Sequence, residues 1–260
     1  MQYKNYSSIL DNIKELLPYL SLTFQYVLLA LLFGFIFALL LAVMKLCKYK
    51  VLRAIAQIYT TIMRCLPSVV LLFVVYFFLP KFSREVLLID IDDVPKILFV
   101  VLTFALFLGG FLSEVMRSAY QAVSKDQMDA ALSIGLTPLQ AFIRIILPQA
   151  FYYAIPNLAN TVIYLLKEGA LAYTIGLIDV MGRAYQMNTL SYSVYPIPIF
   201  VALALIYWPL AIVIEQLFKI LERLMNPIKE DKKTAGQKLK GFKAKYLGFL
   251  VQTPKGGAEK

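Results

Sequence analysis

The sequence has no histidine and only two cysteines, Cys47 and Cys65. Serine–histidine and cysteine–histidine catalysis are therefore excluded. Two cysteines make no disulfide framework, and without histidine they make no Cys/His metal site. The chain also lacks the Gly-x-x-x-x-Gly-Lys-Ser/Thr loop that cradles nucleotide phosphates. We therefore expect no catalytic residue, no metal and no cofactor in this chain.

Charged residues are scarce as well. They make up 16% of the 260 residues, while hydrophobic residues make up 60% and the mean hydropathy is +0.70. Soluble domains average about 25% charged and about 45–50% apolar residues. A departure in both directions at once indicates a membrane protein.

Long apolar runs predict the architecture. Five of them can cross about 30 Å of hydrocarbon at about 1.5 Å per helical residue, so we expect an all-α membrane protein with five transmembrane helices. The expected spans are residues 22–44, 54–79, 97–119, 150–178 and 197–221. The chain then divides into an N-terminal amphipathic segment (1–20), a transmembrane domain (21–225) and a basic tail (226–260). The first segment fits an interfacial helix and a frayed helix end equally well.

Lysine and arginine predict the orientation, because they are enriched in cytoplasmic connections. The first connection holds Lys45, Lys48, Lys50 and Arg53, and the tail holds nine lysines against three acidic residues. The N-terminus is therefore expected outside, with the first and third connections and the C-terminus in the cytoplasm. Most of the net charge of +10 lies in the tail. That distribution favours contact with anionic membrane lipid, and we expect no nucleic-acid partner.

The third connection contains an unusual stretch, residues 129–148, that is apolar without being a span. Gly135 permits a turn at a helix end, and Thr137-Pro138 supplies a cap and first residue for a second helix. Pro148 is expected to break that helix where the fourth span begins. Such a helix–turn–helix surface on the cytoplasmic side is suited to docking a soluble partner.

The same stretch resembles the coupling motif of ABC importer permeases, which reads Glu-Ala-Ala, three residues, Gly, nine residues, Ile, one residue, Leu-Pro. All the spacings match, and aspartate replaces the first glutamate. The matching residues are Asp129, Ala130, Ala131, Gly135, Ile145, Leu147 and Pro148.

The resemblance extends over about residues 20–225 and points to permeases for polar amino acids. Arg64-Cys65-Leu66-Pro67 is similar to that family's Arg-Gly-Thr-Pro segment, with Cys-Leu in place of Gly-Thr. Residues 113–127 resemble the family's sequence leading into the coupling motif, and 147–176 resemble the segment after it. In the latter, Glu168-Gly169-Ala170 replaces Asp-Thr-Ser. Residues 167–182 also resemble permeases for cystine uptake in Gram-positive bacteria.

The resemblance implies a type I ABC importer permease, a multi-pass protein of the bacterial cell membrane that is not itself an enzyme. Its cytoplasmic coupling helix would lie between helices 3 and 4. Two ATPase subunits would bind ATP and Mg and hydrolyse the ATP. The other implied partners are a second permease subunit, either the same chain or a paralogue, and an extracellular or periplasmic substrate-binding protein. Cystine or another polar amino acid is the implied substrate.

Four charged residues lie inside the expected spans, where each costs about 2.5–3.5 kcal/mol unless it faces protein or a pore. Glu114, Lys167, Glu168 and Arg64 are therefore candidates for the substrate path. In the family, acidic residues at the positions of Glu114 and Glu168 line the pocket, where a carboxylate binds a substrate's ammonium group. The alternative for Glu114 is a pair with Arg117 three residues on. The alternative for Glu168 is a structural pair. Arg64 could take a substrate carboxylate or bind lipid phosphate near the interface, and a structural role is favoured over both.

A second class of function is a stand-alone secondary transporter or channel. It would show inverted repeats or a chain of intramembrane carboxylates that relay protons. Neither is evident in five spans, so an ATP-driven permease is the favoured hypothesis.

Overall fold

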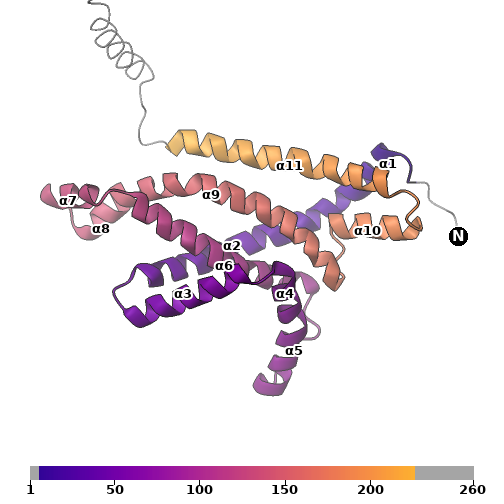
Figure 1. Ribbon diagram of the computed structural model, residues 1–260, viewed down its shortest axis with the longest axis horizontal. Helices are drawn as coiled ribbons and strands as arrows, with labels where there is room; N and C mark the ends of the chain where they lie inside the picture. Colours follow the sequence, from indigo (N-terminus) through magenta and orange to yellow (C-terminus); the bar gives the residue numbers. More distant parts are fainter. Residues whose placement is uncertain (1–5, 226–260) are drawn as a thin grey trace, which may run out of the picture. The chain divides into compact units, whose positions relative to one another are not determined.

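The computed structural model describes residues 6–225, and all the regular secondary structure of these residues is helical (Figure 1). The expectation of an all-α protein is confirmed for this part of the chain. The α-helices are α1 (Ile9–Leu16), α2 (Leu20–Leu46), α3 (Lys50–Cys65), α4 (Ser68–Phe73), α5 (Leu79–Phe82), α6 (Lys96–Ala122), α7 (Lys125–Ser133), α8 (Pro138–Ala141), α9 (Leu147–Glu168), α10 (Val180–Leu190) and α11 (Pro196–Met225). Short 3₁₀ turns are η1 (Leu17–Tyr19) and η5 (Gly169–Ile175), and π-turns are η2 (Val74–Phe78), η3 (Ser83–Leu87) and η4 (Phe142–Ile146).

Three helical segments are long and apolar enough to cross a membrane: Ile9–Leu46, Lys96–Ala122 and Pro196–Met225. Two further pairs qualify only if each is taken as one bent span. They are Lys50–Cys65 with Ser68–Leu87, bent by 107°, and Pro138–Ile175 with Val180–Leu190, bent by 50°. The described chain therefore offers three to five spans, and the full five require both bent pairs.

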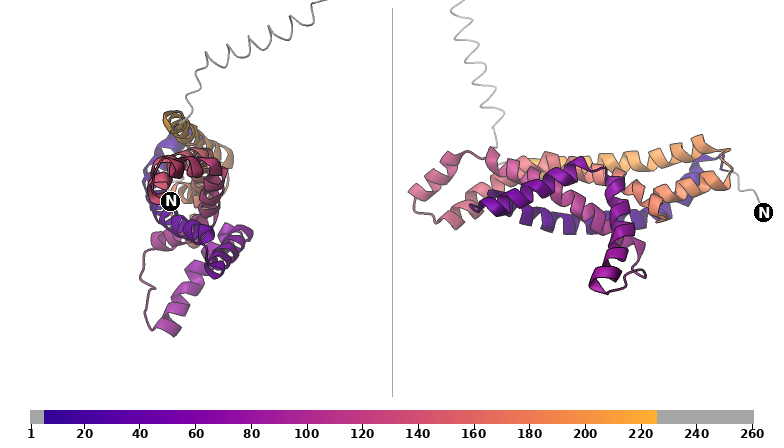
Figure 2. Two further views of the ribbon diagram at one scale, coloured as in Figure 1. Left: turned by 90° about the vertical axis from the view of Figure 1, so that its left-hand side faces the viewer. Right: turned by 60° about the horizontal axis from the view of Figure 1, so that its bottom comes forward.

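The expected second span, 54–79, is not a straight helix. The chain turns at Leu66 and Pro67, both of which are extended, with ψ of 132° and 134°. Proline has no amide hydrogen and disfavours helical geometry in the residue before it, so α3 ends here. The arm of α4, α5 and their π-turns then projects away from the bundle (Figure 2).

Close packing of α2 against α6 forms the centre of the bundle, and glycines make it possible. A Cβ at Gly34 would lie 2.8 Å from Leu108 Cβ, and a Cβ at Gly109 would overlap the ring of Phe37. Small residues at such crossings let two backbones approach closely, which is how apolar helices associate when no water drives them together. Tyr26, Phe104 and Leu108 are fully buried beside this crossing.

The N-terminal segment belongs to this bundle. Only the short 3₁₀ turn η1 separates α1 from α2, so the helical run begins well before residue 22. Leu16 is fully buried against residues of α10 and α11, and Glu15 forms an ion pair with Arg183 of α10. The boundary that the sequence suggested at residues 20 and 21 therefore lies inside a nearly continuous helix. The amphipathic face of α1 packs against protein.

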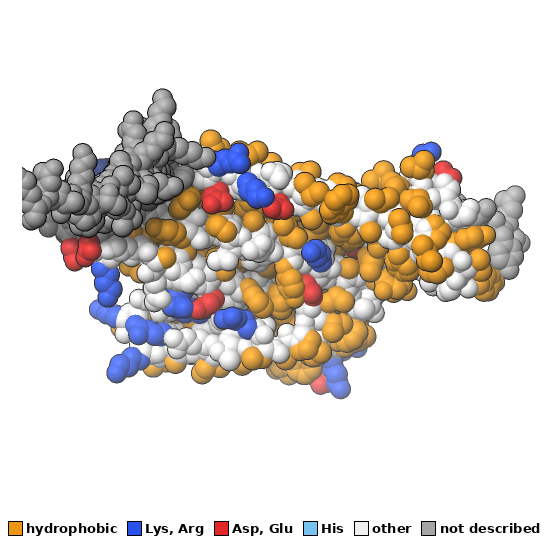
Figure 3. Space-filling model, turned by 45° about the horizontal axis from the view of Figure 1, so that its top comes forward, with side chains coloured by type: hydrophobic (Ala, Val, Ile, Leu, Met, Phe, Trp, Pro, Cys, Tyr) orange, Lys and Arg blue, Asp and Glu red, His pale blue; other side chains and the backbone are white. Residues whose placement is uncertain are grey.

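The connections separate into two ends of the bundle. The α2–α3 turn, α7, α8 and the C-terminal end of α11 lie at one end, on the left in Figure 1, while α1 and α10 lie at the other. On the face shown in Figure 3, Lys and Arg side chains gather toward the end of α7 and α8, and hydrophobic side chains predominate toward the opposite end. The connections that were predicted to be cytoplasmic therefore lie at the same end of the bundle. The basic tail 226–260 lies outside the described residues.

A candidate coupling surface and transport path

The helix α7 and the turn after it follow local sequence chemistry. The Ser124 side chain caps α7 by accepting a hydrogen bond from the amide of Asp126 at 3.3 Å. At the other end Gly135 has φ +88°, a conformation that favours glycine. Its amide donates to the carbonyl of Leu132 at 3.0 Å, and the next amide, of Leu136, donates to that of Ala131 at 3.2 Å. This pair of bonds closes a Schellman turn, so Gly135 ends α7 as predicted.

The second half of the stretch begins with the helix start that the sequence predicted. Thr137 and Gln140 form a capping box, and Pro138 occupies the first position of α8. The helix then continues through the π-turn η4 into α9. The expectation that Pro148 breaks the helix is therefore wrong. Pro148 lies in the first turn of α9, directly after a π-turn whose wider hydrogen-bonding pattern accommodates a missing donor.

The motif residues divide into a packed set and an exposed set. Ala131 is 2% exposed and Ile145 is half-buried beside a small core of Val123, Ile146 and Ala150. The remaining side chains are exposed, namely those of Asp129, Ala130, Leu147 and Pro148. Met128 of α7 and Ile145 of η4 both pack on that core, which holds α7 against η4 and the start of α9. The exposed set remains available for contact with another subunit.

Sequence reasoning missed four exposed apolar side chains of this region. We call Leu132, Ile134, Leu139 and Ile143 the coupling tip; they lie on α7, its terminal turn, α8 and η4. Ile134 is 77% and Leu139 is 67% exposed. Large apolar side chains concentrated on a short connection indicate a contact with protein or membrane. The sequence feature that could have revealed them is their position on either side of Gly135, because side chains at such a turn have no core to pack against.

A hollow of about 650 Å³ lies between the end of α6, the start of α7 and η4. Asp129 and Lys125 supply charged groups to it, and Met128 and Ile146 supply apolar ones. A side chain from a docking partner of mixed polarity would fit such a recess.

The charged residues of the expected spans occupy separate places. Glu114 contacts Arg117, the pair three residues apart that the sequence allowed, with Nε lying 3.0 and 3.1 Å from the two carboxylate oxygens. Lys45 also reaches this carboxylate at 3.2 Å, and its ammonium group donates to Ser113 Oγ at 2.9 Å. The side chain of Lys45 is 1% exposed, although the sequence suggested a cytoplasmic connection for it. Glu114 is therefore neutralised within the protein.

Glu168 lies far from Glu114. It accepts a hydrogen bond from Ser68, the first residue of α4, and so connects the end of α9 with the bend after Pro67. The rings of Phe107 and Tyr164 stack with centroids 6.0 Å apart and align the antiparallel helices α6 and α9. Glu114 lies seven residues after Phe107, and Glu168 lies four residues after Tyr164. Because the two helices run antiparallel, the glutamates are separated by about 16 Å along the bundle. Lys167 is exposed and points away from Glu168, as adjacent helix positions do.

Arg64 is the remaining candidate. It is exposed near the end of α3, and its guanidinium carbon lies 5.9 Å from the centre of the Phe111 ring. It lines a groove of about 770 Å³ between α3 and α6 that also contains Lys45, Glu114 and Arg117. The structure thus brings Arg64 and Glu114 into one groove and leaves Lys167 and Glu168 outside it.

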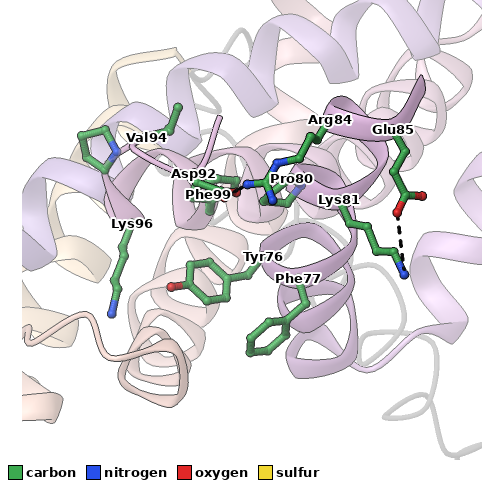
Figure 4. Close-up of a pocket in the computed structure, with 11 residues that line it drawn as sticks. Tyr76, Phe77, Pro80, Lys81, Arg84, Glu85, Asp92, Val94, Lys96 and Phe99 are labelled. Carbon is green, nitrogen blue, oxygen red and sulfur yellow. Dashed lines mark ion pairs between the residues drawn. The ribbon is translucent and has the colours of Figure 1, made fainter. Parts of the chain in front are cut away.

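A further hollow of about 770 Å³ lies in the projecting arm (Figure 4). Tyr76, Phe77 and Phe99 supply aromatic rings to it, while Arg84 pairs with Asp92 across the turn that leads to α6. Lys81 also pairs with Glu85, and because both of these pairs are exposed, each contributes little to stability. Within residues 6–225, no group of three or more Cys, Asp or Glu side chains is placed to hold a metal ion.

These features define a class of protein: a multi-pass helical membrane component with exposed apolar side chains on a turn at one end. A family model described as "Binding-protein-dependent transport system inner membrane component" matches residues 30–227. The chain belongs to this family. The family resemblance drawn from the sequence motifs is thereby confirmed.

Curated relatives include two permeases of Bacillus subtilis (strain 168). The L-cystine transport system permease protein TcyL is 34% identical over 213 residues, covering 82% of this chain and 88% of the relative. The arginine transport system permease protein ArtQ is 32% identical over 222 residues, covering 85% of this chain and 97% of the relative. A crystal structure of "an amino acid ABC transporter with histidines" matches with a TM-score of 0.71 and 28% identity, over 83% of this chain and 98% of that one. The MetNI methionine ABC transporter matches with a TM-score of 0.59 at 19% identity, which shows the fold alone.

Proposed function

We propose that this chain forms the membrane path of an ATP-driven importer of polar amino acids and receives the work of ATP hydrolysis through residues 129–148. The observation that carries this proposal is the coupling tip. Ile134 and Leu139 are exposed on a turn whose geometry is held by Gly135 and a capping box, at the end of the bundle where Lys and Arg gather. Rigid elements that present an apolar tip are suited to transmitting the movement of a docked subunit.

The partners follow from the same proposal. ATPase subunits bind ATP and Mg and dock on the coupling tip from the cytoplasm, while a substrate-binding protein delivers the amino acid from outside. The chain then crosses the bacterial cell membrane five times, with α3–η3 and α8–α10 as its two bent spans. A second permease subunit, either another copy or a paralogue, completes the path. Family membership supports this arrangement over a stand-alone transporter, because the family is binding-protein-dependent.

Cystine is the substrate we propose first. Its support is the relative TcyL, which covers most of this chain, together with the likeness of residues 167–182 to cystine permeases. Relatives named for arginine and glutamine match at similar identity, so these amino acids are the competitors to include in any assay.

The test is uptake of radiolabelled L-cystine by proteoliposomes that contain the chain, its ATPase subunits and its binding protein. Uptake is expected to require ATP and to compete with the unlabelled amino acid that the complex prefers. Replacing Asp129 and Gly135 together by tryptophan should abolish uptake and ATPase binding. Ile58→Trp, on the exposed apolar face of α3, is the matched control and should retain both.

Two results would count against the proposal. ATP-driven uptake that is unchanged in the double variant would mean that residues 129–148 do not couple. Uptake without ATP, driven by a proton gradient across the vesicle membrane, would favour the stand-alone transporter.

A further inference from the structure

Polar side chains line the groove between the amphipathic helix α3 and the apolar helix α6. Its volume of about 770 Å³ falls within the range of about 300–1,000 Å³ that is typical of ligand pockets. No aliphatic side chain lines it. The lining residues are Lys45, Gln57, Thr60, Thr61, Arg64, Cys65, Glu114 and Arg117.

The α3 side of the groove is a polar stripe. Gln57, Thr61 and Arg64 are exposed and follow one another at intervals of four and three residues, so they lie on one face of the helix. Ile58 and Ile62, also exposed, lie on another face. One face of α3 therefore suits lipid, and the other suits water or a polar solute.

A second polar stripe runs along α9. Asn157, Asn160 and Lys167 are exposed there at helical spacing. Exposed amide and ammonium groups are costly in hydrocarbon, so the face that carries them is expected to look into a water-filled path or onto a partner subunit.

The two stripes border one aromatic strip of α6. Phe111 lies beneath Arg64 of α3, and Phe107, whose ring centre is 4.6 Å from that of Phe111, stacks on Tyr164 of α9. The polar faces of α3 and α9 thus flank the same part of α6. Together these two faces form a polar surface in an otherwise apolar bundle.

The charges in the groove are unbalanced. Lys45, Arg64 and Arg117 face a single carboxylate, that of Glu114, which Lys45 and Arg117 already hold. Within the described range 6–225, Arg64 forms no ion pair. Its guanidinium group lies over the ring of Phe111 instead. A guanidinium group with free donors in a partly enclosed groove is suited to binding a carboxylate through two parallel hydrogen bonds.

We propose that Arg64 binds the α-carboxylate of the transported amino acid in this groove, and that Gln57 and Thr61 accept hydrogen bonds from its α-ammonium group. Thr61 Oγ1 donates to the carbonyl of Gln57 at 2.9 Å, so the hydroxyl proton is used and its lone pairs remain to accept. The Gln57 side chain adds a neutral acceptor. The groove therefore recognises the part that all α-amino acids share, and it selects against solutes without a carboxylate. This inference rests on the proposed function.

The experiment measures equilibrium binding to the purified permease–ATPase complex in nanodiscs, without the binding protein. The probes are radiolabelled L-cystine and L-arginine, compared with L-cystine dimethyl ester and L-arginine methyl ester, in which no carboxylate remains. Arg64→Gln should weaken binding of the free amino acid that the complex imports at least tenfold, equivalent to about 1.4 kcal/mol. Arg64→Lys should fall between wild type and Arg64→Gln. The methyl ester should bind weakly to wild type and be insensitive to Arg64→Gln. Arg53→Gln, on the same helix but outside the groove, is the charge-matched control and should bind like wild type.

Three other outcomes would contradict the inference. If Arg64→Gln binds both free amino acids within about twofold of wild type while wild type imports them, Arg64 does not hold the carboxylate and the inference is overturned. If Arg64→Gln instead loses only a co-purifying anionic lipid, detected by native mass spectrometry, the groove is a lipid site and the inference is equally overturned. If wild-type proteoliposomes import neither amino acid, the proposed function fails, and the inference fails with it.

Discussion

Replacing Gly135 by alanine tests the proposed coupling surface at its most sensitive residue. Gly135 has φ +88°, and no atom lies within 4 Å of the position that an added Cβ would occupy. The methyl group therefore meets no neighbour, and the whole cost comes from holding an L-residue in left-handed geometry, about 1–2 kcal/mol. Two hydrogen bonds, to the carbonyls of Ala131 and Leu132, depend on that geometry and set the direction in which α8 leaves the turn.

If the ATPase subunits bind only this form of the turn, the strain appears in their affinity. A cost of about 1–2 kcal/mol corresponds to about a 5- to 30-fold weakening. Asparagine tolerates left-handed geometry better than alanine, so Gly135→Asn should weaken binding less than Gly135→Ala. The measurement is the dissociation constant of purified ATPase subunits for the permease in nanodiscs. The melting temperature of the permease is recorded alongside it to exclude global unfolding.

Gly176 provides a matched control, because it also has positive φ, +76°, but lies near α10 at the opposite end of the bundle. A Cβ there would meet only the flexible end of Lys96, at 2.9 Å. Gly176→Ala should therefore cause similar strain without changing ATPase affinity. Unchanged affinity in Gly135→Ala, or equal weakening in both variants, would refute the reasoning.

Three further predictions concern other contacts. Ile134→Ser should weaken ATPase binding about tenfold or more without lowering the melting temperature, since the side chain is 77% exposed; an unchanged dissociation constant would remove it from the coupling tip. Gly109→Ala should destabilise the permease by about 1–3 kcal/mol, because its Cβ would overlap the Phe37 ring, and Phe37→Leu should restore part of the loss in thermal unfolding. Ser68→Ala removes the hydrogen-bond donor to Glu168 and should lower the melting temperature by an amount equivalent to about 1–3 kcal/mol; no change would show that the carboxylate finds another partner.

Much of the coupling surface was predictable from the sequence because it is built from local interactions. Gly135 ends a helix and Thr137-Pro138 begins the next, and both effects depend on neighbours within four residues. Pro148 was predicted wrongly for a related reason. A proline usually breaks a helix, but here the π-turn η4 before it accommodates the missing donor, and sequence patterns do not reveal such a turn.

The bent spans show a second limit. Hydropathy predicted a second span over 54–79, interrupted by Arg64 and Pro67, and gave no angle for the interruption. The 107° bend after α3 became evident only in three dimensions, where Glu168 accepts a hydrogen bond from Ser68 at the start of α4. Hydropathy reports how apolar a segment is and carries no information about its direction.

The partners of the charged residues were the least predictable feature. Lys45 looked like one of several cytoplasmic lysines, yet its side chain is buried and joined to Glu114, 69 residues away. Arg64 and Glu114 share a groove, whereas Glu168 lies on the far side of the bend. Composition and short-range spacing were enough to establish a helical membrane protein, its family and the turn that ends α7, because each depends on residues close together in the chain. Only the packing of α2, α3, α6 and α9 decided which charges meet and which one has no ion-pair partner among residues 6–225, because those contacts join residues that are distant in sequence.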